Sequence, residues 1–235
     1  MRYPRALVEG RLIRRYKRFL ADIQLPQGVI TASCPNTGSM MGCCEPGSRV
    51  WLSESDSATR KYRHTWELVE VTDEVLVGIN TGLPNALVAE ALASGVIAEL
   101  RGYSSVRREV LFGEERSRVD LLLEAEGRAP CYVEVKNVTA AASRGVALFP
   151  DCVSERGTRH PRELMRLKAH GARPVQLYCV QRGDVREVRP ADGIDHEYGR
   201  TLRAAIAAGV EVLAYRADIT PTEVRLAERI PVVCP

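Results

Sequence analysis

The alternation of apolar and polar residues over residues 117–139 predicts two antiparallel strands joined by a tight turn. In the stretch SRVDLLLEAEGRAPCYVEVKNVT, every second residue is apolar on each side of a turn around Gly127. One register places all of these apolar residues on the same face, and a slip by one residue would spoil the match. That register pairs Val119 with Val135, Leu121 with Val133 and Leu123 with Cys131.

The same register sets two carboxylates, Asp120 and Glu134, directly opposite each other. Like charges in that position repel, so a cation is expected between them. Lys136 follows Glu134 on the same face, about 7 Å along the strand, but it supplies one positive charge against two negative charges. Mg²⁺ neutralises such a pair better, because it is bound through one or two carboxylates together with waters and phosphate oxygens. The pattern therefore predicts a metal site with a lysine beside it; a structural ion-pair cluster is the alternative.

Short apolar runs separated by turn residues predict a small all-β domain over residues 1–82. The runs are LIRRYKRFLADIQL, GVITASC, SRVWLSE, TWELVEV and EVLVGIN. Four or five strands in about seventy residues fit a five-stranded OB-like barrel.

From residue 83 onward the pattern changes to strands that alternate with helices, which predicts an α/β domain over residues 83–235 with a mixed sheet. The first helix, ALVAEALASG, is apolar almost all round and is therefore expected to be buried, with Asn85 as its cap and Glu90 in need of a partner. A strand over 103–112 and the hairpin follow. The remaining elements are a helix HPRELMRLKAHG, a strand RPVQLYCVQR, a helix EYGRTLRAAIAAG capped by Asp195, a strand VEVLAYRADI and a tail IPVVCP.

The composition is that of an ordinary soluble protein and says little about the function. The chain has 27% charged and 45% hydrophobic residues and a net charge of +3, as is usual for soluble globular proteins. No run approaches the roughly 18 apolar residues of a membrane span, and the N-terminus lacks a signal core, so a cytoplasmic protein is expected. The seven cysteines include no C-x-x-C pair and do not predict a zinc site. Motifs of serine hydrolases, phosphate-binding loops, dinucleotide-binding folds and zinc proteases are absent from the sequence.

Basic and aromatic residues are interleaved in two stretches of the predicted barrel, RRYKRF and RKYRHTW. On OB-like barrels such mixtures bind single-stranded nucleic acid through stacking and charge. Arg15, Tyr16, Lys17, Arg18 and Lys61 are therefore candidate nucleic-acid contacts. A solvated basic face is the alternative for the cations, and core packing is favoured for the two tryptophans.

Two arginines at the entrance of the predicted hairpin, Arg116 and Arg118, are further candidates for phosphate contacts. A guanidinium group matches the geometry of phosphate oxygens. The neighbouring Glu114 and Glu115 offer both arginines an alternative partner.

Arg156, His160 and Glu163 have the helical spacing i, i+4, i+7 and are expected to share a helix face near the metal site. There His160 would be a proton shuttle or a phosphate contact. The alternative is a capping role or a structural hydrogen bond for His160, which Pro161 directly after it favours.

The order of these features resembles the PD-(D/E)xK nuclease-like fold: a buried helix with a glutamate, a hairpin with Asp and Glu-x-Lys, and an α/β unit. The resemblance implies that Asp120, Glu134, the backbone carbonyl of Val135 and Glu90 bind one or two Mg²⁺ or Mn²⁺ ions. It also implies that Lys136 is catalytic, since it would orient or deprotonate the attacking water or support the developing negative charge.

Longer motifs resemble the sugar fermentation stimulation protein A family over about residues 5–222. They are, in order, RRYKRFLADI, CPNTGSM, RKYRHTWEL, GEERSRVDLLL, YVEVKNVT and SERGTRHPRELMRL. The family implies an N-terminal OB-like domain, a C-terminal domain of the restriction-endonuclease-like fold and DNA binding, and its members are described as regulators linked to maltose metabolism.

The sequence thus predicts a DNA-binding protein with a metal-dependent nuclease centre at Asp120, Glu134 and Lys136. One alternative is a non-catalytic DNA-binding regulator of maltose metabolism genes with a vestigial site. A sugar-metabolism enzyme is the third hypothesis, which no sugar-binding or phosphate-loop motif supports.

Overall fold

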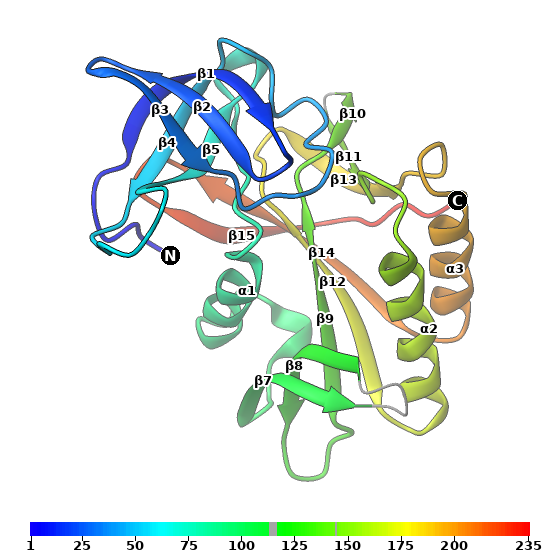
Figure 1. Ribbon diagram of the computed structural model, residues 1–235. Helices are drawn as coiled ribbons and strands as arrows, with labels where there is room; N and C mark the ends of the chain where they lie inside the picture. Colours follow the sequence, from blue (N-terminus) through cyan, green and yellow to red (C-terminus); the bar gives the residue numbers. More distant parts are fainter. Residues whose placement is uncertain (113–116, 144) are drawn as a thin grey trace.

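Strands of the N-terminal third close into a small barrel, seen at the upper left of Figure 1. The computed structural model describes residues 1–112, 117–143 and 145–235. The strands of the barrel follow one another as β3-β2-β1-β4-β5-β6, and a parallel pair between Ser33 and Thr65 joins β3 to β5. This arrangement confirms the predicted OB-like barrel. Its strands are β1 (Val8–Tyr16), β2 (Leu20–Leu25), β3 (Gly28–Ser33), β4 (Arg49–Glu54), β5 (His64–Glu70) and β6 (Leu76–Gly78).

The first apolar run of the barrel is two strands rather than one. A tight turn at Lys17 and Arg18 separates β1 from β2, and these residues have positive φ values of 49° and 66°. The loop has three residues, 17–19, between the paired Tyr16 and Leu20, and three-residue loops are a common hairpin connection. The turn brings the basic residues of RRYKRF to the tip of a hairpin.

A mixed sheet forms the centre of the second domain, in the order β15-β14-β12-β9-β8-β7. The three central strands β9, β12 and β14 are parallel, and antiparallel strands flank them on both sides. This confirms the predicted α/β domain with a mixed sheet. Its strands are β7 (Ser105–Phe112), β8 (Ser117–Glu124), β9 (Cys131–Val138), β12 (Arg173–Val180), β14 (Glu211–Ile219) and β15 (Val224–Ile230).

Helices lie on both sides of this sheet (Figure 1). On one side, α1 (Pro84–Ala93) packs Leu87 and Val88 against the sheet core. On the other side lie α2 (Glu155–Ala169) and α3 (His196–Ala207), which pack against each other. A small second sheet and two short 3-10 helices complete the fold: β10 (Ala141–Ser143), β11 (Gly145–Phe149), β13 (Val185–Pro190), η1 (Thr72–Glu74) and η2 (Ala98–Leu100).

The boundaries of several elements differ from the sequence predictions. The cap of α1 is Leu83, so Asn85 is a residue of its first turn and not its cap. Helix α2 begins earlier than predicted, with Ser154 as its cap, and Pro161 is therefore inside the helix. The predicted tail is held to the second domain, because Val188 exchanges backbone hydrogen bonds with Pro231 and Val233.

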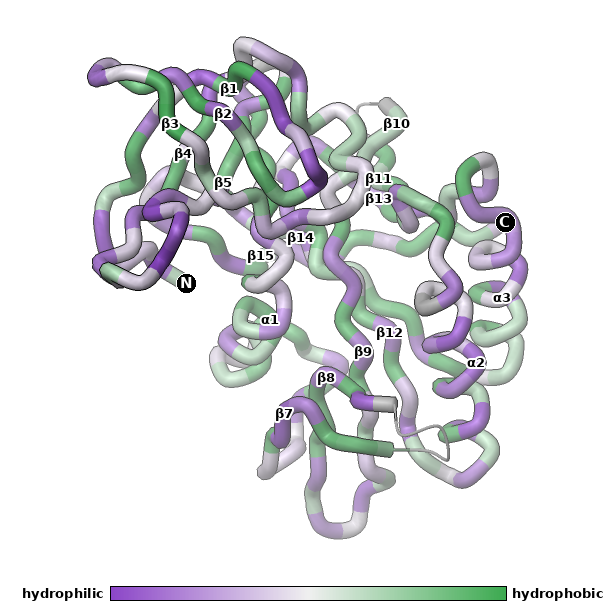
Figure 2. The backbone as a smooth tube through the Cα atoms, viewed as in Figure 1, coloured by the Kyte–Doolittle hydropathy of each residue, from purple (hydrophilic) through white to green (hydrophobic). Residues whose placement is uncertain are grey.

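Helix α2 is unusual in what it buries. Figure 2 shows it as predominantly hydrophilic, whereas hydrophobic residues follow much of the neighbouring strand β12. The buried residues of α2 include Thr158, His160 and Glu163. A helix that packs polar side chains against a sheet indicates a buried polar site at that face. No helix within the described ranges has the length and apolarity needed to cross a membrane.

The two domains share a hydrophobic core. Trp51 and Leu68 of the barrel belong to the same buried cluster as Leu87 of α1 and Leu121 of β8. The chain passes from the barrel to α1 through residues 79–83. Two side chains of this segment form hydrogen bonds with the barrel. Asn80 donates to Glu67 of β5 at 2.7 Å, and Thr81 donates to the carbonyl of Pro35, after β3, at 2.8 Å.

Candidate active site

Asp120 lies where strands β8 and β9 separate. The predicted pairs Leu121–Val133 and Leu123–Cys131 are confirmed, whereas the predicted pair Val119–Val135 is not part of the described β8–β9 ladder, which ends at Leu121. One residue beyond, the carboxylate of Asp120 accepts a hydrogen bond from the backbone N–H of Val135 (2.7 Å). Its other oxygen accepts a hydrogen bond from the side-chain amide of Asn85 (2.8 Å). Asp120 is therefore held between the hairpin and the first turn of α1.

Glu134 forms a compact buried cluster with Lys136 and His160. The Lys136 ammonium group donates to Glu134 Oε1 at 2.8 Å and lies 2.9 Å from His160 Nδ1. His160 Nδ1 also contacts Glu134 Oε1. Each of the three residues is at most 9% exposed. Strand β9 thus presents two charged groups to α2, which supplies the imidazole.

The two carboxylates have opposite pKa shifts. Burial, and then the charge of Glu134, raise the pKa of Asp120 above its ordinary value, outweighing the hydrogen bonds from Val135 and Asn85. Burial also acts to raise the pKa of Glu134, but the hydrogen bond to His160 and the charge of Lys136 outweigh it, so that pKa is lowered. Negative charge is therefore compensated at Glu134 and under-compensated at Asp120.

This donor set fits a hard divalent cation. Each oxygen of Asp120 accepts one described hydrogen bond and keeps a further lone pair. The N–H and C=O groups of one strand residue point to the same edge, so the carbonyl of Val135 lies on the Asp120 side. In the described part of the chain no group of three or more His, Cys, Asp or Glu residues is placed to hold a metal. Two carboxylates, a carbonyl and waters match Mg²⁺ and not a closed zinc site.

Glu90 does not join this site. It forms an ion pair with the N-terminal amino group at 3.0 Å, and its side chain is 51% exposed. The residue of α1 that reaches Asp120 is Asn85. The expectation that Glu90 contributes to the metal site is not supported by its placement.

Among the predicted accessory residues, His160 is the one whose described contacts reach the cluster. It binds Glu134 and Lys136, so it is neither a helix cap nor remote from the carboxylates. Glu163 is buried one turn further along α2. Arg156 belongs to the same helix, but its side chain lies outside the described residues, and Arg116 also lies outside them.

Some of the predicted nucleic-acid contacts are exposed, whereas others already form hydrogen bonds within the protein. Arg15 is half-buried, and its guanidinium donates to the carbonyls of Arg18 (2.8 Å), Asn36 (2.9 Å) and Gly38 (2.9 Å), so its role is to hold the β1–β2 hairpin against the following loop. The hydroxyl of Tyr16 donates to Asp22 at 3.0 Å. The exposed members of the set are Lys17, Arg18, Lys61 and Arg118.

Two residues that sequence reasoning missed contact this region. Asn85 was considered only as a helix cap, although its amide holds Asp120. Glu109 of β7 lies between the residues that pair with Leu121 and Val119, and its φ is 51°. Its carboxylate accepts from the amide of Asn85 at 3.5 Å. Positive φ in a non-glycine residue is uncommon and concentrates at functional sites. No signal in the sequence marks this backbone conformation.

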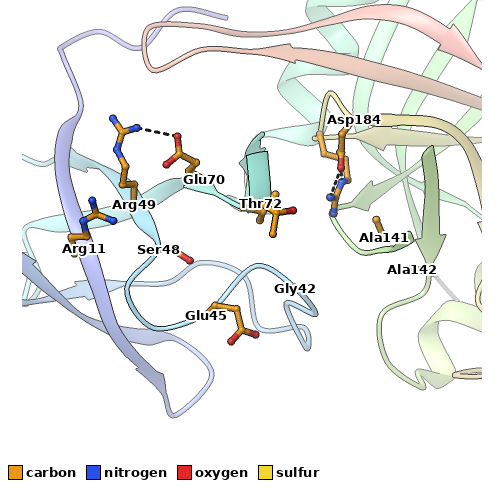
Figure 3. A pocket seen from close by; sticks show the side chains of 12 residues that line it. Arg11, Gly42, Glu45, Ser48, Arg49, Glu70, Thr72, Ala141, Ala142 and Asp184 are labelled. Atoms are coloured by element: carbon orange, nitrogen blue, oxygen red, sulfur yellow. Dashed lines mark hydrogen bonds and ion pairs between the residues drawn. The ribbon is translucent and has the colours of Figure 1, made fainter. Parts of the chain in front are cut away.

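A cleft of about 530 Å³ lies between the barrel and the small sheet of the second domain. Figure 3 shows Arg11 and Arg49 on the barrel side and Ala141, Ala142 and Asp184 on the other side. Its charges are largely neutralised: Arg49 pairs with Glu70 at 3.0 Å, and Arg182 pairs with Asp184 at 2.7 Å. This cleft therefore offers less net positive charge to a phosphate backbone than its arginines suggest.

An OB-like barrel joined to a mixed α/β domain that carries Asp, Glu and Lys on a splayed hairpin defines a two-domain protein of the restriction-endonuclease-like class. The model of the SfsA N-terminal OB domain matches residues 13–79, and that of the sugar fermentation stimulation protein RE domain matches residues 82–223. The chain belongs to the sugar fermentation stimulation protein family.

Relatives and a solved structure agree with this assignment. A sugar fermentation stimulation protein homolog of Geobacter metallireducens is 59% identical over 99% of this chain and 100% of its own length. The homolog of Thioalkalivibrio sulfidiphilus is 60% identical over 98% of this chain and 96% of its own length. The structure of Pyrococcus furiosus SfsA in complex with Ca²⁺ has a TM-score of 0.87 and 25% identity, and covers 99% of this chain and 98% of its own.

Proposed function

We propose that this protein binds nucleic acid, most directly DNA in the cytoplasm, and hydrolyses phosphodiester bonds with Mg²⁺ or Mn²⁺ bound between Asp120 and Glu134. The observation that carries the proposal is the placement of two largely buried carboxylates where β8 and β9 separate, with Lys136 beside them. The Pyrococcus furiosus relative was solved with Ca²⁺, a hard cation that prefers oxygen ligands, which supports a divalent ion here.

The side chains around the carboxylates fix their positions. Asn85 and the N–H of Val135 orient Asp120, and Lys136 with His160 orients Glu134. Asp120, Glu134 and the carbonyl of Val135 would hold the ion. When bound, the ion would supply a more acidic water and offset negative charge on the phosphate.

Lys136 has the charge and the location to act on the substrate. Its ammonium group supports negative charge that develops on a phosphoryl oxygen, and such preorganised stabilisation is worth most in a site that excludes water. With a proton on Nδ1, His160 donates to Glu134 Oε1, and the carboxylate fixed in this way holds the ammonium group of Lys136 in place. The exposed Lys17, Arg18 and Lys61 of the barrel would contact the phosphate backbone.

A second candidate function, DNA binding without cleavage, is favoured by one observation. Lys136 and His160 together compensate Glu134 without any metal ion, so half of the site is electrostatically complete by itself. A regulator of sugar metabolism genes that keeps this cluster as a structural ion pair would show the same geometry.

Cleavage assays on labelled single- and double-stranded DNA and RNA separate the two functions. The wild type, Asp120→Ala and Lys136→Ala would be incubated with Mg²⁺, Mn²⁺ or EDTA, and binding would be read in the same mixtures. We expect metal-dependent cleavage that falls at least about 100-fold in both variants, because each removes one preorganised charge from the reacting centre.

Glu90→Ala is the matched control, since it removes a carboxylate of α1 that points away from the site. Its cleavage rate should equal that of the wild type. Tight binding by all four proteins with no cleavage under any metal condition would refute the nuclease and leave the regulator.

A further inference from the structure

A polar pocket of about 270 Å³ lies at the junction of the two domains. The loop after β3 supplies one wall, and the end of β9 together with the end of β11 and the residues that follow it supply the others. The residues that matter for its chemistry are Asn36, Thr37, Asn137, Thr139, Phe149 and Asp151. None of them belongs to the carboxylate cluster or to the predicted nucleic-acid contacts.

Hydrogen-bonding groups in this pocket are oriented but unused. Asn36 Oδ1 accepts from the N–H of Gly38 at 2.8 Å, and Asn137 Oδ1 accepts from Gln181 at 2.7 Å. These bonds fix both amides and leave each NH₂ group without an acceptor among the described residues. The hydroxyl of Thr139, which is 5% exposed, likewise has no described hydrogen-bond partner. These donors line the pocket and are already oriented, so a ligand with matching acceptors can bind them without reorganising the side chains.

The remaining walls supply an anionic acceptor and an aromatic ring. Asp151 Oδ2 accepts from the hydroxyl of Ser39 (3.2 Å) and the N–H of Met40 (3.3 Å), which hold the carboxylate at the pocket. Glycine at position 38 leaves room for the carboxylate in this position, since a Cβ there would lie 2.5 Å from Asp151 Oδ2. Phe149 is supported by Tyr178 and Tyr198, with ring centroids 5.5 Å and 5.2 Å away.

The amide donors, the carboxylate and the aromatic ring of this pocket suit a nucleobase better than a phosphate group. Directional amide donors and a carboxylate acceptor match the mixed donor and acceptor edge of a base, and an aromatic ring matches its apolar face. The Asp151 carboxylate repels a phosphate group, which has no donor to offer it.

The pocket is adjacent to the proposed active site. Asn137 is two residues beyond Val135 on β9, a distance of about 7 Å along a strand. Thr81, which also lines the pocket, is four residues before Asn85, the residue that holds Asp120. We infer that this pocket receives one unpaired nucleobase of the nucleic acid whose phosphodiester lies at Asp120 and Glu134. The inference rests on the proposed function, and it implies a single-stranded or locally opened substrate, because a base within a duplex cannot enter a pocket.

Fluorescence anisotropy with two labelled strands tests the pocket directly. The probes are a single-stranded DNA dodecamer and a strand of equal length that lacks bases, both in EDTA so that neither is cleaved. Thr37→Phe places a ring into the pocket from its exposed rim, and Thr139→Val removes the unpartnered hydroxyl at nearly constant shape. Val29→Phe, at a position 59% exposed on β3, is the control for added aromatic surface.

We expect Thr37→Phe to bind the base-containing strand about tenfold more weakly than the wild type, the loss typical of one stacked base. Thr139→Val should weaken it about threefold to tenfold. Neither variant should change binding of the abasic strand, and Val29→Phe should change neither. Equal weakening on both strands, or wild-type binding by Thr37→Phe, would overturn the inference.

Cleavage of the dodecamer with Mg²⁺ or Mn²⁺, measured on the same proteins, keeps the two proposals apart. Cleavage by the wild type with unchanged base-dependent binding in Thr37→Phe would refute the pocket and keep the nuclease. Base-dependent weakening without cleavage by any protein would support the pocket and refute the nuclease.

Discussion

Asp120 is well held by hydrogen bonds, but its surroundings disfavour the ionised form of its carboxyl group. Two hydrogen-bond donors hold it at the separation of β8 and β9, yet burial and the neighbouring Glu134 raise its pKa. A carboxyl group whose folded-state pKa is raised contributes its full stability only below its unfolded pKa, near 3.9, and loses it as the pH rises through the folded value. At neutral pH and without metal, the ionised Asp120 therefore destabilises the fold.

Asp120→Asn should consequently stabilise the metal-free protein at neutral pH. We expect Tm to rise by about 2–4 °C, the shift that roughly 1 kcal/mol produces in a chain of this size. The gain should shrink as the pH falls toward the raised pKa of Asp120, because the wild-type carboxyl group then takes up a proton. Differential scanning calorimetry in EDTA between pH 4 and pH 8 measures this dependence.

Asp22→Asn provides the opposite case. Burial alone would raise the pKa of Asp22, but hydrogen bonds from Arg14, Thr31 and Tyr16 outweigh it and lower that pKa. Its replacement should lower Tm at neutral pH, and the loss should diminish in acid. A fall in Tm for Asp120→Asn at pH 7 would contradict the electrostatic account of the site.

The position of a single residue could be predicted from the sequence where the hydrophobic periodicity shows which face of a strand or helix the residue occupies. Alternation in the hairpin determined the register, and with it the positions of Asp120, Glu134 and Lys136 on facing strands. Helix α1 gave no such information, because a helix that is apolar almost all round has no readable polar face. Glu90 was therefore expected at the site that Asn85 occupies. The positive φ of Glu109 depends on tertiary structure and has no sequence signature.

At the scale of elements, Asp195 connects the two helices that cover the Glu134 side of the sheet. Its side chain caps α3 by accepting from the N–H of Tyr198 at 2.9 Å. Its other oxygen accepts from the N–H of Ser154, the cap of α2, at 3.3 Å. Because α2 carries His160, this one carboxylate helps to position a residue that contacts Glu134 and Lys136.

Replacing Asp195 with alanine should cost more than replacing Ser154. Ser154→Ala removes one capping bond, to Gly157, and should cost about 1 kcal/mol. Asp195→Ala removes its own cap and leaves the N–H of Ser154 without this acceptor, so we expect about 2 kcal/mol. Urea unfolding of the two variants beside the wild type gives both values, and equal costs would show that the link between the helices contributes nothing.

The type of most long elements was predicted, and the errors have physical causes. The run over residues 12–25 was taken as one strand because alternation continues through the Lys17–Arg18 turn, which contains neither glycine nor proline. The strands β10, β11 and β13 escaped notice because they are short and their pattern is set by neighbouring strands. Strand β15 alternates with many charges, as an edge strand does, and was left without an assignment.

At the scale of the whole molecule, the two domains are expected to unfold together. The barrel has a core of its own around Trp66, but Trp51 and Leu68 pack in the same cluster as residues of α1 and the central sheet, so separating the domains would expose part of that cluster. Both tryptophans of the chain, Trp51 and Trp66, lie in the barrel, whereas the three α-helices of the described chain lie in the second domain. Trp66 lies in the barrel's own core, so its fluorescence reports on the barrel, while the helical signal reports on the second domain.

Tryptophan fluorescence and circular dichroism at 222 nm should show the same urea midpoint. Fluorescence follows the barrel and the helical signal follows the second domain, and coincidence of the two is the standard test of a single transition. Midpoints that differ by more than the fitting error would show that the domains unfold independently.

The crossing between the domains has a mechanical consequence. Within a few residues, Asn80 holds Glu67 of the barrel, Thr81 holds the loop at Pro35, and Asn85 holds Asp120. The segment therefore connects the barrel directly to a carboxylate of the proposed metal site. A nucleic acid whose binding rotated the barrel would displace the Asn85 amide that orients Asp120, so binding at the barrel and chemistry at the proposed site would be coupled through six residues of backbone.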